Sequence, residues 1–211
     1  MPKSVLKRLP GYLAYLRNMP QDSPQYISAT AIAKALAMGE VQVRKDLAAV
    51  SDGGRPKVGY LRTNLIDDLE RFLGYGSAHN AILVGAGRLG LALLEHNGFR
   101  EYGLNILAAF DIAPQAEQSE SGKPILPMEQ MERFCRENQV AMGIITVPSE
   151  QAQRVCDQLV QSGIQAIWNF PTVHLEVPEH ILVQNENMAA SLAVLRIHLQ
   201  EQIKEKNEVT L

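Results

Sequence analysis

A glycine pattern near the middle of the chain has the spacing of a phosphate-binding turn. It lies between the apolar run 81–84 and the helix-like run 91–96, and consists of Gly85, Ala86, Gly87, Arg88, Leu89 and Gly90. In this context the first glycine permits a tight turn, the second lets a diphosphate approach the backbone, and the third lets the helix pack closely on the strand. Free amides and a partial positive charge at the start of the helix then bind the phosphates. The sequence therefore predicts a dinucleotide site here, with a packing turn that binds no ligand as the alternative.

An acidic residue follows at the distance that such a site requires. Asp111 ends the apolar run 105–111 and lies 21 residues beyond Gly90, with Ile112 directly after it. A carboxylate in this place accepts hydrogen bonds from the ribose hydroxyls and repels a 2′-phosphate. It favours NAD and NADH over their 2′-phosphorylated forms. The alternative is a loop carboxylate with no ligand.

A third group of candidates ends the next expected strand. Thr146, Val147 and Pro148 close the apolar run 141–148. Ligands of open α/β sheets bind at the carboxyl ends of the strands, so these residues are candidates for the ribose and nicotinamide side of the site. A strand that is merely stopped by proline would give the same pattern.

The first part of the chain has the spacing of a helix-turn-helix. Helices are expected over 28–36 and 40–50, joined by three residues that include a glycine. The second helix has Gln42, Arg44 and Lys45 on its polar side. Arginine and glutamine read base edges with paired hydrogen bonds, and lysine contacts phosphate. These three residues are the predicted DNA-reading side chains, and a solvated charged helix is the alternative.

The residues that flank this pair of helices add further candidates for DNA contact. Residues 51–63 are rich in glycine and cations and are expected to form a β-hairpin wing that carries Arg55, Lys57 and Tyr60. Arg8 lies just ahead of the first helix, which is expected to become regular at about Pro10. A helix over 64–73 follows the wing.

The charge is divided unevenly along the chain. Residues 1–76 hold 11 Lys and Arg against 7 Asp and Glu, a balance of +4, whereas residues 77–211 hold 9 against 16, a balance of −7; together they give the net charge of −3. Only the front of this acidic protein is therefore suited to a polyanion. The low aromatic content of 6% argues against a stacking surface for single-stranded nucleic acid.

The order of the elements predicts an α/β protein with two domains and a terminal helix. Residues 1–76 form the winged-helix domain, residues 77–186 a Rossmann-type domain, and residues 187–211 a helix for dimerisation. In the second domain strands alternate with helices, which implies a parallel sheet covered on both faces. The expected strands are 81–84, 105–111, 141–148, 164–171 and 181–183, with an exposed loop at 113–123.

Other classes of protein are disfavoured by the composition. The chain has no apolar run of 18 residues and no apolar stretch after its first cations, so neither a membrane span nor a signal peptide is expected. The two cysteines, Cys135 and Cys156, lack the spacing of metal ligands and are expected to be buried free thiols. A cytoplasmic protein without a bound metal is the prediction.

With these residues in view, the chain resembles the Rex family of bacterial redox-sensing repressors nearly from end to end. The motifs that carry the resemblance are KRLPGYL (7–13), QVRKDL (42–47), VGAGRLG (84–90), ITVPSEQAQ (145–153), WNFP (168–171) and LEVPEHILVQN (175–185). The resemblance implies homodimers whose C-terminal helix swaps onto the partner. It implies binding to double-stranded operator DNA when NAD prevails and release when NADH rises. It also brings Asn169 into the expected cofactor set.

The chain departs from the family pattern in two places. The wing reads SDGGRPKVGY, where family members usually have a sequence rich in phenylalanine and glycine, and this puts the wing's DNA contacts in doubt. In the family an Asp, a Tyr and an Arg form a network that differs between the NAD and NADH states, and the matching positions here are Asn187, His96 and Ala14. Loss of all three together avoids an uncompensated charge near the nicotinamide. We expect Met188 to take the apolar place beside that ring.

Two other functions fit parts of the sequence. One is a winged-helix regulator that senses another nucleotide-bearing ligand such as coenzyme A, which Asp111 disfavours because it would repel a ribose 3′-phosphate. The other is an NAD-dependent oxidoreductase, which needs a general acid or base held over its substrate. His174 and His180 are available for that role, but no orienting carboxylate or substrate clamp accompanies them.

Overall fold

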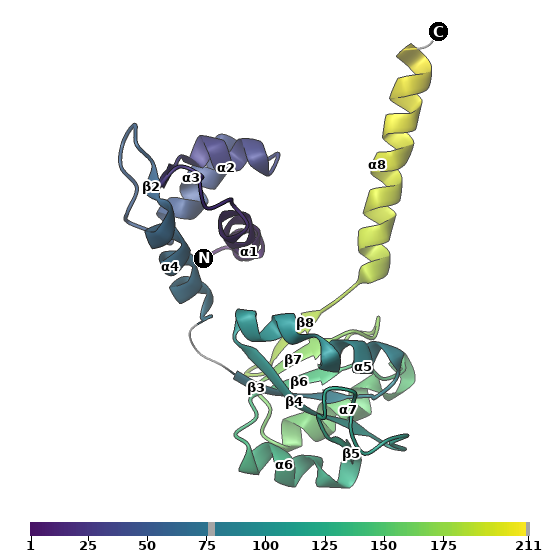
Figure 1. Ribbon diagram of the computed structural model, residues 1–211. Coiled ribbons are helices and arrows are strands. Elements are labelled where there is room, and N and C mark those ends of the chain that lie inside the picture. Colours follow the sequence, from purple (N-terminus) through teal and green to yellow (C-terminus); the bar gives the residue numbers. More distant parts are fainter. Residues whose placement is uncertain (76–78, 210–211) are drawn as a thin grey trace. The chain divides into compact units, whose positions relative to one another are not determined.

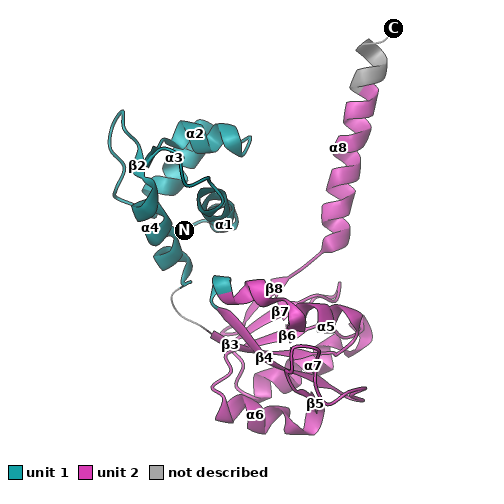
Figure 2. Cartoon of the chain, viewed as in Figure 1, with its two compact units in different colours: residues 1–78, 101–103 teal, residues 79–100, 104–211 magenta. Residues whose placement is uncertain are grey.

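The structure, a computed structural model of the chain, describes residues 1–75 and 79–209. It divides into two compact units, which Figure 2 colours separately. Unit 1 comprises residues 1–78 and 101–103, and unit 2 comprises residues 79–100 and 104–211. The expected domain boundary at 76 and 77 falls on residues outside the described ranges and stays a prediction.

Unit 1 is a small helical fold with a two-stranded antiparallel sheet (Figure 1). Its elements are α1 (Lys3–Arg17), β1 (Tyr26–Ile27), α2 (Ala29–Ala35), α3 (Glu40–Ala48), β2 (Tyr60–Leu61) and α4 (Arg62–Leu73), and β1 pairs with β2. The apolar faces of the four helices meet in one core, which includes Leu9, Leu13, Ile32, Leu47 and Leu65. Ser28 caps α2, because its hydroxyl accepts a hydrogen bond from the Ala31 amide at 3.1 Å.

Two expectations for unit 1 are wrong. The first helix begins at Lys3, and Pro10 lies inside it. A proline costs a helix one hydrogen bond, but here buried Leu9, Leu13 and Leu16 hold the segment in place. The wing is not a hairpin of two regular strands. It closes through a single bridge between Arg55 and Gly59, and β2 pairs with the distant β1.

Unit 2 is built on a parallel sheet of six strands. The strands are β3 (His79–Val84), β4 (Leu104–Asp111), β5 (Ile125–Pro127), β6 (Met142–Ile145), β7 (Ala166–Asn169) and β8 (Leu182–Asn185). Their order across the sheet is β5-β4-β3-β6-β7-β8, and every pair is parallel. This is the strand order of the doubly wound dinucleotide-binding fold. The strand order reverses between β3 and β6, which defines the switch point where ligands of such sheets bind.

Helices cover both faces of the sheet (Figure 1). On one face α6 (Met131–Glu137) and α7 (Ser149–Gln161) pack on Ile82, Phe110, Ile145 and Ile167. On the other face α5 (Arg88–Glu95) packs on Leu83, Ile106 and Ile144, through Leu94. Two short 3-10 helices lie between other elements: η1 (Asn97–Tyr102) between α5 and β4, and η2 (Met128–Gln130) between β5 and α6. The expected parallel sheet with two covered faces is confirmed.

The ends of several elements differ from expectation. Strand β5 was not expected, because three residues after a polar loop give too short an apolar pattern to indicate a strand. The last strand is 182–185 rather than 181–183. The two cysteines are buried and free, as expected, and burial raises the pKa of both thiols to about 11. At neutral pH they are therefore protonated and poorly reactive.

The chain ends in a long helix, α8 (Met188–Val209). Asn187 begins it, since the Asn187 side-chain oxygen accepts a hydrogen bond from the Ala190 amide at 2.8 Å. The apolar side chains of α8 are largely exposed in the single chain: Met188, Leu192, Val194, Leu195, Ile197, Leu199 and Ile203. No helix in the described part of the chain is long and apolar enough to cross a membrane.

Candidate functional site

The glycine turn connects β3 to α5 with a backbone that glycine alone makes easily. Gly85 has a φ of +105°, and its amide donates to the Phe110 carbonyl at 2.8 Å. Gly87 is the residue before the helix, and no side chain caps its amides. Gly90 packs so closely on the turn that a Cβ there would lie 1.9 Å from the Gly85 carbonyl oxygen. Gly85 and Gly90 thus have the turn and packing roles that the sequence predicts, whereas the approach of a diphosphate to Gly87 stays a prediction. Nothing lies within 4 Å of a Cβ built at Gly87.

Thr146 fixes the turn from the neighbouring strand. Its hydroxyl donates to the carbonyl oxygens of Gly85, at 2.8 Å, and of Val84, at 3.0 Å. Its amide also donates to the Val84 carbonyl at 2.9 Å. Thr146 follows β6 and Gly85 follows β3, so these bonds join the two strands at the switch point. The role of Thr146 visible in the structure is therefore to position the glycine turn.

Asp111 is tied to the same turn. One carboxylate oxygen accepts a hydrogen bond from the Ala86 amide at 2.7 Å, and the other accepts from the Ala113 amide at 2.9 Å. Each carboxylate oxygen has two lone pairs, so both oxygens can still accept from a ribose hydroxyl. The two amides fix the orientation of the carboxylate beside the glycine turn.

These residues meet in a cavity of about 470 Å³. The predicted residues that line it are Gly85, Gly87, Asp111, Ile112, Thr146, Val147 and Pro148. Ile112 is largely exposed at its rim. The cavity has the size expected of a small-molecule or cofactor site. Three segments that are far apart in the sequence therefore form one site, at the edge of the sheet that the topology indicates.

The sequence analysis missed one wall of this cavity. Gln151, Arg154, Val155 and Gln158 lie on one face of α7 and line it, together with Met128 and Glu129 of η2. The signal was available, because the α7 residues have the helical spacing i, i+3, i+4, i+7 directly after Pro148. That spacing shows which residues share a face. It does not show which face looks toward the glycine turn.

Other predicted cofactor residues lie outside the cavity lining. Arg88 and Leu89 are exposed at the start of α5, Met188 is exposed on α8, and Ala86 and Gly90 belong to the turn itself. Asn169 is completely buried. Its amide nitrogen donates to the carbonyls of Pro171 and Val173, at 3.1 Å each, and to the Asn185 side chain at 2.8 Å. Asn169 thus fastens the ends of β7 and β8.

Ala14, His96 and Asn187, the positions at which the sequence departs from the pattern it resembles, have three different local environments. His96 ends α5 and stacks edge-on against Phe99, with ring centroids 4.7 Å apart. Asn187 caps α8. Ala14 lies in α1 and is half-buried.

Helix α3 presents the predicted DNA-reading side chains. Gln42, Arg44 and Lys45 are exposed, while Val43 and Leu47 are fully buried and hold the helix on the unit 1 core. Arg44 forms an ion pair with Glu40, one turn earlier on the same helix. The polar side of α3 therefore faces solvent, as the helix-turn-helix prediction requires.

Arg8 is held inside unit 1. Its guanidinium forms two hydrogen bonds with the Asp46 carboxylate, at 2.7 and 2.9 Å, and the Tyr12 hydroxyl donates to the same carboxylate at 2.7 Å. With its amide in the orientation that satisfies both partners, Gln42 accepts from the same guanidinium at 2.9 Å. Arg8 therefore joins α1 to α3, and its predicted contact with DNA stays a prediction.

This cluster makes the stability of unit 1 depend on pH. Burial opposes ionisation of Asp46, but the bonds from Arg8 and Tyr12 outweigh it and lower its pKa. The carboxylate then stabilises the folded unit above its ordinary pKa of about 4, and this contribution is lost as the pH falls toward the lowered value. Asp46→Asn should destabilise unit 1 by about 2 kcal/mol at pH 7 and by less at pH 3. The test is pulsed hydrogen–deuterium exchange of the whole protein at increasing urea concentrations, read by mass spectrometry on the proteolytic fragments that contain α1 and α3. An equal loss of unfolding free energy at pH 7 and pH 3 would contradict the prediction.

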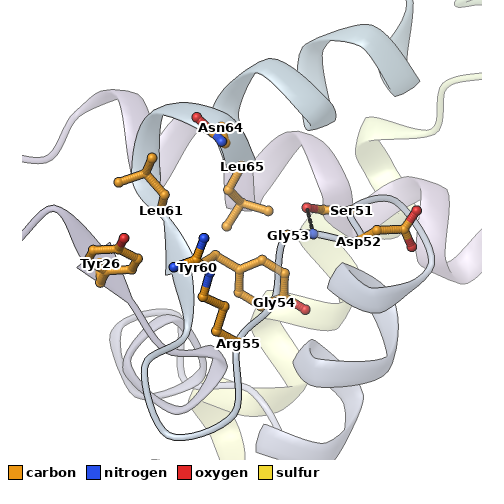
Figure 3. A pocket seen from close by; sticks show the side chains of 10 residues that line it. All are labelled: Tyr26, Ser51, Asp52, Gly53, Gly54, Arg55, Tyr60, Leu61, Asn64 and Leu65. Carbon is orange, nitrogen blue, oxygen red and sulfur yellow. Dashed lines mark hydrogen bonds between the residues drawn. The ribbon is translucent and has the colours of Figure 1, made fainter.

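Tyr60 corrects the prediction for the wing. Its side chain is 7% exposed and packs in the unit 1 core, so it is not a DNA contact. Figure 3 shows its ring against Gly54, where a Cβ would lie 2.8 Å from the ring. Gly59 has a φ of +93°, and a Cβ there would meet the Ile27 carbonyl oxygen at 2.3 Å. The wing base is therefore closed around an aromatic anchor, and Arg55 and Lys57 remain its exposed cations.

The pocket drawn in Figure 3 has a volume of about 260 Å³ and lies between the wing and the start of α4. Its lining includes both charge signs, with Asp52 and Arg55, and the Ser51 hydroxyl is already used, since it donates to Asp68 at 2.6 Å. Among the described residues no group of three or more His, Cys, Asp or Glu side chains is placed to hold a metal ion.

Comparison with sequence families gives two matches. Residues 1–48 match a family described as a putative DNA-binding protein N-terminus. Residues 77–173 match a family described as a CoA binding domain. The first range lies within unit 1, and the second covers β3 to β7 of unit 2 with the helices between them.

Individual proteins match over almost the whole chain. The redox-sensing transcriptional repressor Rex of Porphyromonas gingivalis is 40% identical over 196 residues, which covers 92% of this chain and 90% of that protein. The protein of the same name from Carboxydothermus hydrogenoformans is 36% identical over 205 residues, which covers 95% and 97%.

Solved structures match equally fully. RSP, a Rex-family repressor, in complex with NAD+ and operator DNA is 30% identical, with a TM-score of 0.88, and the match covers 98% of this chain and 96% of RSP. RSP in complex with NADH is also 30% identical, with a TM-score of 0.86 and 98% coverage of both chains.

Proposed function

Because the chain belongs to the Rex family of redox-sensing transcriptional repressors, we propose that it binds operator DNA as a homodimer and releases it when NADH binds. The relatives carry the repressor name, and RSP binds NAD+, NADH and operator DNA. Unit 1 supplies the DNA-binding surface, with Gln42, Arg44 and Lys45 on α3 and Arg55 and Lys57 on the wing. Unit 2 supplies the nucleotide site.

The observation that carries the proposal is the cavity at the switch point. It brings together an uncapped helix start, which suits a diphosphate, and a carboxylate held by two amides, which suits an unphosphorylated ribose. Met128, Val147 and Val155 give the same cavity apolar walls. This combination fits an adenine dinucleotide without a 2′-phosphate, and the proposed ligands are therefore NAD and NADH.

The coupling between the two sites is proposed to differ from the family pattern. Ala14, His96 and Asn187 stand at the positions where the family resemblance implies a charged and hydrogen-bonded network, and Asn187 caps the start of α8 here. The dinucleotide then acts through apolar contacts, with Met188 placed beside the nicotinamide. Calorimetry with NAD and with NADH, each in the presence and absence of operator, measures this coupling, and equal operator affinity with both nucleotides would refute the sensor function.

Asp111 separates the proposed ligand from coenzyme A, which the matched family description favours as a second candidate. Asp111→Ala should weaken NADH binding by about 10- to 100-fold, because ribose hydroxyls lose their charged acceptor. The measurement is the thermal shift caused by NADH and by coenzyme A in wild type and variant. Glu120→Ala, at an exposed position between β4 and β5 outside the cavity lining, is the control and should bind NADH like wild type. Stabilisation of the wild type by coenzyme A but not by NADH would favour the second candidate.

We also propose that the site performs no reaction on the nicotinamide and that the protein acts in the cytoplasm. The ionisable residues that line the cavity are Asp111, Glu129 and Arg154, and Asp111 already accepts two amides. A dehydrogenase needs a general acid or base held over a substrate. Consumption of NADH with small carbonyl compounds tests this, and a steady turnover that Asp111→Ala abolishes would contradict it.

A further inference from the structure

Glu40 stands at the start of the helix that carries the proposed base-reading side chains. It is the first residue of α3, and its carboxylate pairs with the Arg44 guanidinium. The Glu40 and Arg44 side chains are 41% and 63% exposed, so the pair lies on the solvent side of α3. The other acid of this fully described helix, Asp46, is buried and bound by Arg8 and Tyr12. Glu40 is therefore the one acid that α3 presents to an approaching DNA.

The Glu40–Arg44 ion pair is not needed to keep α3 folded. An exposed ion pair one helical turn apart contributes little to folding. Buried Val43 and Leu47 already hold α3 on the core. A carboxylate on this surface also repels every phosphate that comes near, which lowers affinity for all sequences. Glu40 also stabilises the N-terminus of α3 a little, because a carboxylate in the first turn interacts favourably with the helix dipole. The consequence that bears on DNA recognition is its effect on Arg44.

We propose that Glu40 is a specificity-determining residue that positions Arg44 for base reading. The inference rests on the proposed function of unit 1 as the operator-binding domain. An arginine without a partner binds any phosphate strongly, and such contacts carry no sequence information. The bond to Glu40 uses one of the two Nη2 hydrogens of Arg44. The second Nη2 hydrogen remains, and with the Nη1 or Nε hydrogen on the same edge of the guanidinium it can meet the two acceptors of a guanine edge. The Glu40 carboxylate thus disfavours contacts between Arg44 and phosphates, and it holds the Arg44 side chain in position to enter a DNA groove.

Gln42, the other proposed base-reading side chain of α3, also has a partner within the protein. Gln42 accepts from Arg8, which is anchored by Asp46. Both polar side chains that can read bases on α3 therefore have an internal partner, whereas Lys45 has no ion pair among the described residues. This difference fits a surface on which Arg44 and Gln42 read the bases and Lys45 contacts the phosphate backbone of the DNA.

The test compares Glu40→Gln with wild type on two duplexes. The wild-type protein first selects a duplex from a random-sequence pool, and a scrambled version of it serves as non-specific DNA. On the scrambled duplex the variant should bind about 3- to 10-fold more tightly, with a log–log salt slope steeper by about one, because one repelling charge is gone. On the selected duplex it should gain nothing, so the ratio of the selected to the scrambled affinity falls by the same factor of about 3 to 10.

Two further variants separate positioning from a structural role. Glu132→Gln removes an equivalent pair in the first turn of α6, where Arg136 donates to Glu132 at 2.7 Å, and should leave the affinity ratio unchanged. Arg44→Ala should lower the ratio. Adding Glu40→Gln to Arg44→Ala should then tighten binding to both duplexes equally, because Glu40 has no reader left to position.

An unchanged ratio in Glu40→Gln would overturn the inference. So would a fall in the ratio that persists when Arg44 is already alanine, since Glu40 would then act independently of Arg44. Failure of the wild type to enrich any sequence from the pool would overturn the proposed function and this inference with it. That outcome is seen before any variant is made, so the two failures are distinguishable.

Discussion

The Gly90→Ala variant is expected to lose most of the folding stability of unit 2 and all measurable binding of NADH. The added Cβ would lie 1.9 Å from the Gly85 carbonyl oxygen and 2.9 Å from the Thr146 hydroxyl and the Leu83 side chain. Two of these neighbours are parts of the turn at the switch point, and a backbone atom cannot move aside as a flexible side chain can. α5 must therefore shift away from the sheet. A loss of about 4 kcal/mol is expected from such overpacking, measured by urea unfolding followed by Trp168 fluorescence.

Gly87→Ala is the matched comparison, because it makes the same chemical change three residues earlier. Nothing lies within 4 Å of a Cβ at Gly87, so folding stability should change by less than about 1 kcal/mol. The methyl group would nevertheless stand where a diphosphate must approach the start of α5. NADH should then give no thermal shift to a protein that melts like wild type. Full nucleotide stabilisation of Gly87→Ala would show that the ligand does not lie on this turn.

The site shows what residue spacing can and cannot predict. Gly85, Asp111 and Thr146 were identified because each ends a strand, and a parallel sheet brings the carboxyl ends of its strands to one edge. Arg154 and Gln158 were missed for the opposite reason, since they lie on the side of a helix. The side of α7 that faces the cavity is set by the way the helix packs on the sheet, on the face that includes Ile145 and Ile167. The local sequence does not determine that packing.

The fold shows the same distinction. Alternation of apolar strands and helices predicts the parallel sheet, whereas β5 has three residues and exists because it pairs with Ala109, Phe110 and Asp111 of β4. Tyr60 was assigned to the DNA surface by its place in a cationic loop. The Gly54 and Gly59 backbones instead allow the loop to close over its ring, and such closure depends on contacts with residues about 30 positions away, such as Ile27.

The exposed apolar side of α8 leads to the second prediction with a large expected effect, which concerns the dimer. Leu192, Leu195 and Leu199 lie at spacings of three and four residues, so they share one side of the helix. Val194 and Ile197 lie on other sides and are also more than half exposed. A helix of this length gains little stability alone in water, and most helical stability in proteins comes from packing of an apolar face. The proposed occupant of this face is a second copy of the chain.

Leu195→Glu is therefore expected to convert the proposed dimer to a monomer. Each leucine buried in an interface contributes about 1.5–3 kcal/mol, and twofold symmetry counts every substitution twice. A loss of about 3–6 kcal/mol raises the dimer dissociation constant by at least about 100-fold, and affinity for a two-half-site operator falls with it. Light scattering measures the mass and fluorescence anisotropy the DNA affinity. Gln200→Glu, on the same helix, adds the same charge at an exposed polar position and should stay dimeric. A dimeric Leu195→Glu protein with wild-type operator affinity would place the dimer contact elsewhere and leave the apolar face of α8 without the partner proposed for it.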